Sequence, residues 1–187
     1  MIQETIVTTQ NSSCVAHIAP MGIHVNGDEF IILPFYPSAT LNNLLESKTA
    51  VINYCDDVRV FAGCLTGRRD WPLKPAEKIN GQILACALAH TEVELVRLEE
   101  DAVRPKLFCK ALHTVNHAPF RGFNRGQHAV LEAAILVSRL NRLPLEKIES
   151  EIEYLRIGLD KTAGDREREA WDWLMTAIEN FKTGARA

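Results

Sequence analysis

Residues 31–57 constrain the fold of this chain more than any other stretch. An apolar run ends in two prolines, Ser38 and Thr40 then open a short segment with leucines on one side, and a second apolar run occupies residues 50–54. Short apolar runs on either side of a capped amphipathic segment predict a strand, a helix and a second strand.

The hydroxyl groups of Ser38 and Thr40 allow two interpretations. The first backbone N–H groups of a helix have no partner inside it, so a hydroxyl beside them forms a cradle for a phosphate. Alternatively, the hydroxyls only cap their own helix, which is the more common role of such residues. Taken alone, the stretch favours simple capping.

Antiparallel β-structure is predicted for most of the first 118 residues. The predicted strands are residues 2–9, 15–23, 29–33, 50–54, 83–100 and 106–115. Pro20 cannot donate to a strand ladder, so the second strand is interrupted or lies at an edge there. About six strands in a meander too irregular for parallel βαβ units predict an antiparallel barrel.

Two connecting segments accompany these strands. Asp57 is the predicted cap of a short helix over residues 58–65. Residues 66–80 have no hydrophobic period and are predicted to form a loop, either a lid over a site or a bridge between two parts of the barrel.

The pattern becomes helical after Phe120. Helices are predicted over residues 128–140, from Pro144 and from Asp165. The last helix places Trp171, Leu174, Ile178 and Phe181 on one face. The chain is therefore expected to comprise a barrel domain, residues 1–118, and a helical C-terminal extension, residues 119–187, packed on the barrel.

Charge and composition disfavour several classes of protein. The net charge of −3 and the pI near 6.1 provide no general attraction to nucleic acid or to an anionic membrane. No apolar run is long enough to cross a bilayer, and the N-terminus lacks a basic region followed by an apolar one, so we expect a cytoplasmic protein.

The five cysteines and six histidines are scattered. No C-x-x-C pair or H-E-x-x-H pattern is present, so we do not expect a metal site. The odd number and the scatter of the cysteines lead us to expect a reducing compartment. Cys55 and Cys64 are possible redox thiols, but the sequence places no second cysteine near either, and buried strand cysteines are the expected state.

Four motifs carry a resemblance to a known family: ETIVTT at residues 4–9, HIAPMG at 17–22, AVINYCDD at 50–57 and FNR at 123–125. With the predicted element order, they resemble the FMN-binding split barrels of the flavin-reductase and pyridoxamine-phosphate-oxidase type. More specifically, the chain is similar to an uncharacterised family of that superfamily, found in archaea and in methylotrophic bacteria that use methanopterin-type carbon carriers. The resemblance implies a mainly β plus α protein, an antiparallel split β-barrel with a helical C-terminal part.

The resemblance also implies a cofactor site for FMN. In flavin reductases of this fold, an Ala-Pro-containing strand lies along the isoalloxazine ring and a Ser/Thr–Asn helix start holds the phosphate. The implied contacts are Ala19, Pro20, Met21 and Gly22 with the ring, Ser38, Thr40 and Asn43 with the phosphate, and Asn53 with either. The aspartate that often precedes the threonine in those reductases is missing here.

Three residues before the first C-terminal helix form a second candidate anion site. Arg121 and Arg125 flank a glycine, and Asn124 is a predicted helix cap. An arginine fork beside free helix amides binds a phosphate or carboxylate strongly, whereas a surface ion pair would contribute little. The coincidence of Asn124, Arg125 and Gly126 at one helix start favours binding.

The predicted function is an FMN-dependent oxidoreductase that accepts a hydride from NAD(P)H or another donor and acts on a small substrate, with a pterin-like molecule implied by the resemblance alone. His117 is either a proton donor to that substrate or an ordinary polar loop residue, so no catalytic residue is identified. A non-catalytic flavin-binding carrier or sensor is the alternative, and a cofactor-free structural protein is the third hypothesis. A homodimer is expected, with the flavin near the subunit interface.

Overall fold

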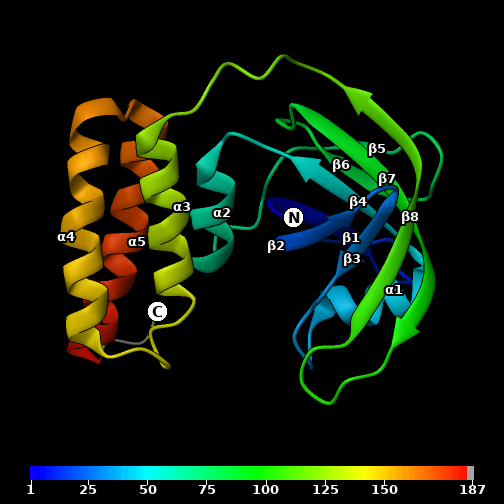
Figure 1. Cartoon of the computed structure of the whole chain (residues 1–187), viewed down its shortest axis with the longest axis horizontal. Helices are drawn as coiled ribbons and strands as arrows, with labels where there is room; N and C mark the ends of the chain where they lie inside the picture. The colour runs from blue at the N-terminus through cyan, green and yellow to red at the C-terminus, as the bar shows by residue number, and fades with distance from the viewer. Residues whose placement is uncertain (185–187) are drawn as a thin grey trace. The chain divides into compact units, whose positions relative to one another are not determined.

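The computed structural model describes residues 1–184 and divides the chain into two compact units (Figure 1). Residues 1–55 and 71–120 form the barrel unit. Residues 56–70 join the chain from residue 121 onward in the helical unit.

The barrel unit is a closed antiparallel barrel with the strand order β1-β2-β3-β8-β7-β4. Its strands are β1 (Ile2–Gln10), β2 (Ala16–Asn26), β3 (Glu29–Ile32), β4 (Thr49–Tyr54), β7 (Ala89–Glu99) and β8 (Lys106–Asn116). The long pair β7 and β8 is antiparallel, as the sequence predicts. The structure confirms the predicted fold class, a split β-barrel with a helical C-terminal part.

The barrel core is filled from the strands and from one helix, α1 (Ala39–Ser47). Because side chains alternate along a strand, Val7 of β1 and Ile52 of β4 point inward and are fully buried. Leu41 and Leu44 of α1 belong to the same apolar cluster. The leucines whose spacing predicts an amphipathic helix therefore also fill part of the barrel core.

The prediction for residues 66–100 is wrong in part. β5 (Leu73–Pro75) forms within the predicted loop and pairs with β6 (Gln82–Leu84), and the strand predicted over residues 83–100 is interrupted between β6 and β7. Buried polar side chains on the outer face of the barrel hold this sheet: the Thr8 hydroxyl donates to the Gln82 carbonyl, and the Leu84 N–H donates to Asn53 Oδ1 at 2.8 Å. These contacts join distant segments, so no local pattern shows them.

Up to residue 184, the helical unit contains four helices: α2 (Val58–Leu65), α3 (Arg125–Val137), α4 (Leu145–Thr162) and α5 (Asp165–Thr183). Val58 and Ala62, one turn apart on α2, belong to the same apolar cluster as the C-terminal helices, and α2 packs against α3 and α5 (Figure 1). That packing explains why residues 56–70 belong to this unit, although they lie within the predicted residues 1–118.

The predicted apolar face of α5 is confirmed at Trp171, Leu174 and Ile178, which are buried, but Phe181 is 40% exposed because it lies in the last turns, beyond the packed core. Helix α3 begins at Arg125, three residues before the predicted start. Within residues 1–184, no helix combines the length and apolarity that a bilayer crossing requires.

Candidate functional site

The start of α1 is capped, and some hydrogen-bonding groups there have no partner among residues 1–184, although Thr40 itself is buried. Ser38 is extended, its hydroxyl accepts the Leu41 N–H at 3.2 Å, and its carbonyl accepts the Asn42 N–H at 3.1 Å. Within residues 1–184, the N–H groups of Ala39 and Thr40 and the Thr40 hydroxyl have no hydrogen-bond partner. Capping and phosphate binding are therefore compatible at this helix start, because the Ser38 hydroxyl bonds one amide and leaves the amides of Ala39 and Thr40 without a partner.

Asn43 lies one turn further along α1 and faces the barrel. Its Nδ2 donates to the Thr9 hydroxyl of β1 at 3.1 Å, and the residue is buried. This bond holds the helix against the strand. Of the predicted phosphate contacts, Ser38 and Thr40 are thus at the helix start, whereas the Asn43 amide is already bonded inside the chain.

Residues 19–22 lie on β2 where no second strand pairs with it. β2 pairs with β1 from Ala16 to His24, but β3 joins it only from His24 onward. The predicted edge position of Pro20 is confirmed. Alternate backbone groups of this stretch point away from β1, which is the geometry that a ligand lying along the strand requires.

The four predicted ring contacts do not share one face of β2. Met21 packs against the barrel core, and Ala19 lies opposite the inward-facing Val7, whereas Pro20 and Gly22 face outward. A Cβ on Gly22 would lie 3.1 Å from Ile2 Cγ2 and 3.4 Å from Glu4 Oε1. The space over this glycine is therefore filled by side chains of β1.

Asn53 is fully buried and holds β6 against the barrel. Its Nδ2 donates to the Ile6 carbonyl at 3.0 Å and to the Thr8 hydroxyl at 3.1 Å, and its Oδ1 accepts the Leu84 N–H at 2.8 Å. The hydrogen-bonding groups predicted to support a flavin are thus engaged within the chain.

The start of α3 in the helical unit has a different arrangement. Asn124 Oδ1 accepts the N–H groups of Gly126 at 2.7 Å and Gln127 at 3.1 Å, and the Thr162 hydroxyl also accepts from Gly126 at 2.8 Å. These amides are occupied. An anion would have to be held here by the exposed side chains of Arg121 and Arg125 rather than by the helix start.

A buried carboxylate was not among the predicted site residues. Glu92 of β7 is fully buried, and its two oxygens accept the backbone N–H groups of Glu77 at 2.8 Å, Lys78 at 2.8 Å and Ile79 at 2.9 Å. Burial acts to raise the pKa of Glu92, but these bonds and the one from His90 lower it below its usual value. The ionised carboxylate therefore holds the segment before β6 on the barrel.

A histidine pair continues from this carboxylate. His90 Nε2 lies 3.4 Å from Glu92 Oε1, and His90 Nδ1 lies 2.8 Å from Nε2 of His117, whose ring stacks on it at 5.0 Å. Burial lowers the pKa of His90, so the ring is neutral and donates from Nε2 to the carboxylate. Nδ1 of His90 then accepts from Nε2 of His117.

The sequence does contain a signal for this cluster. His90 and Glu92 are two residues apart in a predicted strand, so their side chains share one face, and both interrupt an apolar pattern. Within the part of the chain that the structure describes, no group of three or more His, Cys, Asp or Glu residues could hold a metal ion.

Gln10, at the end of β1, is a second residue that the sequence pattern does not single out. Its Nε2 donates to the Cys14 carbonyl at 3.4 Å, but Oε1 is buried and has no partner among residues 1–184. Gln10 lies on the same outward face of β1 as Thr8. A buried acceptor without a donor marks this part of the outer barrel surface as a candidate ligand contact.

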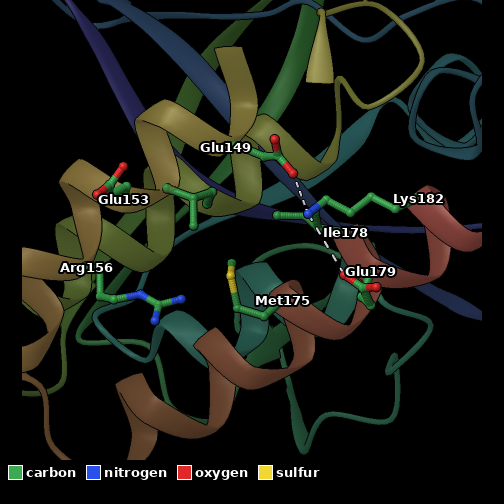
Figure 2. A pocket seen from close by; sticks show the side chains of 8 residues that line it. Glu149, Glu153, Arg156, Met175, Ile178, Glu179 and Lys182 are labelled. Carbon is green, nitrogen blue, oxygen red and sulfur yellow. Dashed lines mark ion pairs between the residues drawn. The ribbon is translucent and has the colours of Figure 1, made fainter. Parts of the chain in front are cut away.

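A hollow of about 500 Å³ in the helical unit lies between α4 and α5 (Figure 2). Lys182 there pairs with Glu149 and, at 3.9 Å, with Glu179, while Arg156 and Met175 line the same hollow. All three charged partners are partly exposed, and none of the lining residues is a predicted site residue. We interpret this hollow as a solvated surface with ion pairs of small net value.

Family models match both parts of the chain. The N-terminal domain of a "Protein of unknown function (DUF447)" matches residues 3–118, and the second DUF447 model matches residues 124–176. Among solved structures, the fold is similar to that of an FMN-bound Methanosarcina mazei protein itself assigned to DUF447, with a TM-score of 0.80 and 23% identity over 94% of each chain.

Two further structures resemble a smaller part of the chain. A 2-nitrobenzoate 2-nitroreductase of Pseudomonas fluorescens has a TM-score of 0.54 and 20% identity over 61% of this chain and 64% of its own. The flavin reductase component of a bacterial two-component tryptophan halogenase has a TM-score of 0.52 and 17% identity over 63% of this chain and 81% of its own. These likenesses show the fold.

Proposed function

The chain belongs to the DUF447 family, and from that membership and the open start of α1 we propose that it binds FMN. The observation that carries the proposal is the pair of unpartnered amides at Ala39 and Thr40, beside a hydroxyl that also lacks a partner within residues 1–184. A helix start of this kind is suited to a phosphate dianion. The FMN-bound Methanosarcina mazei relative supports the choice of ligand.

The residues of the barrel unit fit this cofactor in three respects. The α1 start offers two amides and a hydroxyl, with no acidic side chain in its first turn to repel the phosphate. β2 has no second strand beside residues 16–23, so its backbone is the candidate support for the ring. Ser38 and Thr40 would hold the phosphate, whereas Asn43 and Asn53 would act indirectly, by fixing α1 and β6.

We propose further that the protein is a flavin-dependent oxidoreductase with a small substrate and NAD(P)H as hydride donor. Bound FMN would supply the two-electron chemistry, and the protein would supply binding and orientation. The similarity in fold to a nitroreductase and a flavin reductase supports this class. Arg121 and Arg125 of the helical unit are candidates for contact with an anionic ligand group, through their side chains.

A homodimer working in the cytoplasm completes the proposal. Cys14, exposed and outside any disulfide, is consistent with a reducing compartment. Light scattering after size-exclusion chromatography should give twice the mass of one chain at micromolar concentration. A monomer there would contradict a flavin site shared between subunits.

Titration of the purified protein with FMN tests the central proposal. We expect saturable quenching of flavin fluorescence at one FMN per chain. Absence of saturation would refute FMN binding. Stopped-flow mixing of the loaded protein with NADH or NADPH then separates an enzyme from a carrier, because rapid bleaching of the flavin requires an accessible hydride donor site, whereas inertness toward both donors favours a carrier or sensor.

A further inference from the structure

We propose that Cys55 and Cys86 form a redox pair that closes into an intramolecular disulfide. Their sulfur atoms lie 3.6 Å apart, and Cys86 is exposed while Cys55 is partly exposed. The expectation that Cys55 has no cysteine nearby is therefore wrong. The two cysteines are 31 positions apart in the sequence, and only the fold brings them together.

Backbone contacts on both sides hold the two thiols together. Cys55 follows Tyr54, which pairs with Ala89 in the sheet and accepts the Leu88 N–H at 2.8 Å. On the other side, Asn53 Oδ1 accepts the Leu84 N–H at 2.8 Å. Residue 86 thus lies between two segments that are both bonded to the end of β4.

The local turn fixes Cys86 further. The Ala87 N–H donates to the Leu84 carbonyl at 3.0 Å, which closes a tight turn with Cys86 at its third position. A disulfide bond is about 2.05 Å long, so the sulfurs would need to approach by about 1.5 Å, a change within the range of side-chain rotation. Closure therefore requires no rearrangement of the barrel strands.

The other three cysteines differ from the pair in burial or in position, so they serve as controls. Burial raises the pKa of the Cys64 thiol to about 11 and that of the Cys109 thiol to about 12, so both react slowly near neutral pH. Cys14 is exposed, like Cys86, and lies in the turn after β1. It is a matched control for a reactive surface thiol outside the pair.

The reaction is thiol–disulfide exchange with a low-molecular-weight disulfide as oxidant. The Cys86 thiolate attacks one sulfur of that disulfide, forms a mixed disulfide and releases one small thiolate. The Cys55 thiolate then attacks the Cys86 sulfur, forms the intramolecular bond and releases the second small thiolate. Two protein thiols lose two protons and two electrons, and one small disulfide is reduced to two thiols.

Closure would constrain the segment between the two cysteines. That segment contains residues 56–70, which belong to the helical unit, and β5 of the barrel unit. A cross-link over a loop of this length stabilises the native state mainly by restricting the unfolded chain. We therefore expect the oxidised protein to unfold about 5–10 °C higher than the reduced protein.

The test is oxidation of the full-length protein with hydroxyethyl disulfide, followed by rapid alkylation and peptide mass spectrometry. The expected result is a linkage between the peptides that contain Cys55 and Cys86, with a mass loss of two hydrogens from the chain. In Cys55→Ser the mixed disulfide should persist on Cys86. In Cys14→Ser the linkage should form as in the natural sequence.

Two outcomes would overturn the proposal. One is a stable mixed disulfide on Cys86 in the natural sequence, which would show that Cys55 does not resolve it. The other is the loss of both thiols to links between chains. Because peptide mapping of the unmodified sequence decides both, the proposal stays falsifiable if a serine variant folds poorly. The readout is independent of FMN, so its failure would leave the flavin proposal untouched.

Discussion

The starts of α1 and α3 look alike in sequence and differ in what they offer a ligand. Each begins with a residue whose side chain accepts helix amides, Ser38 in α1 and Asn124 in α3. At α3, Asn124 accepts the amides of Gly126 and Gln127, and Thr162 also accepts the amide of Gly126. At α1, two amides have no partner among the described residues. A cap therefore does not reveal whether a helix start is open.

A third set of amides shows why the difference arises. The N–H groups of residues 77–79 converge as they would on a bound anion, but Glu92 of the same chain fills the place. Thr162 lies 36 residues from the amide it accepts, and Glu92 lies 13 to 15 residues from its donors. Whether amides are open depends on distant residues that supply acceptors, and among residues 1–184 no such residue reaches the first two amides of α1.

The largest expected effect is at Glu92. Replacement by Gln removes the charge and turns an NH₂ group toward converging N–H donors, so we expect a loss of about 3 kcal/mol in the free energy of unfolding. Denaturant unfolding measures the loss, and hydrogen exchange at residues 77–79 should accelerate first. The control is Glu94→Gln on the same strand, where the carboxylate is 44% exposed and pairs with Lys110, and where we expect less than about 0.5 kcal/mol. Equal effects at both positions would refute the internal anion site.

The pH dependence of stability follows from the same cluster. The pKa of His90 in the folded chain lies below the ordinary 6.5, so the unfolded chain takes up a proton at this residue at a higher pH than the folded chain does. The free energy of unfolding therefore falls as the pH drops below about 6.5. The pKa of Glu92 lies below 4.5, so a second loss follows below that pH. His113 and His117 also face His90 and help to lower its pKa, and Glu77 pairs with His113.

Unfolding free energies measured from pH 8 to pH 4 check this prediction. His90→Gln should flatten the profile between pH 6.5 and 5, whereas His128→Gln, at an exposed position of α3, should leave it unchanged. A profile that His90→Gln does not alter would assign the pH dependence to other groups.

A smaller effect is expected at the open helix start. Thr40→Val keeps the shape of a buried side chain and removes a hydroxyl with no partner among the described residues, so the fold should persist. If that hydroxyl contacts the FMN phosphate, the Kd should rise about tenfold, or about 1.4 kcal/mol. Fluorescence titration measures the change. An unaltered Kd would remove Thr40 from the phosphate site and weaken the contrast between the two helix starts.

The reciprocal test is at α3. Asn124→Ala removes the acceptor of two amides and should cost about 1 kcal/mol of stability, with no change in the Kd for FMN. Thr162→Val should cost about 0.5 kcal/mol, because Gly126 keeps Asn124 as an acceptor. Denaturant unfolding ranks the two variants. A rise in the Kd for FMN in Asn124→Ala would mean that the α3 start contributes to the flavin site after all.

The sequence alone determined the fold class, because local patterns encode it. Alternating apolar residues, tight turns and the leucine spacing of α1 specify strands and helix one by one, and each is stabilised by contacts that its own periodicity predicts. The Pro20 edge and the Ser38 cap were predictable for the same reason, since each depends on a single residue and its neighbours.

Tertiary structure decided which polar groups are available. Asn53 and Thr162 are polar residues in ordinary patterns, but one holds β6 and the other closes the α3 start. Cys55 and Cys86 are distant in sequence and 3.6 Å apart in space. The physical reason is that a hydrogen bond or a thiol contact requires two groups to come close in space. Which segments come close is set by the packing of the whole unit, and the hydrophobic periodicity of a single segment does not contain that information.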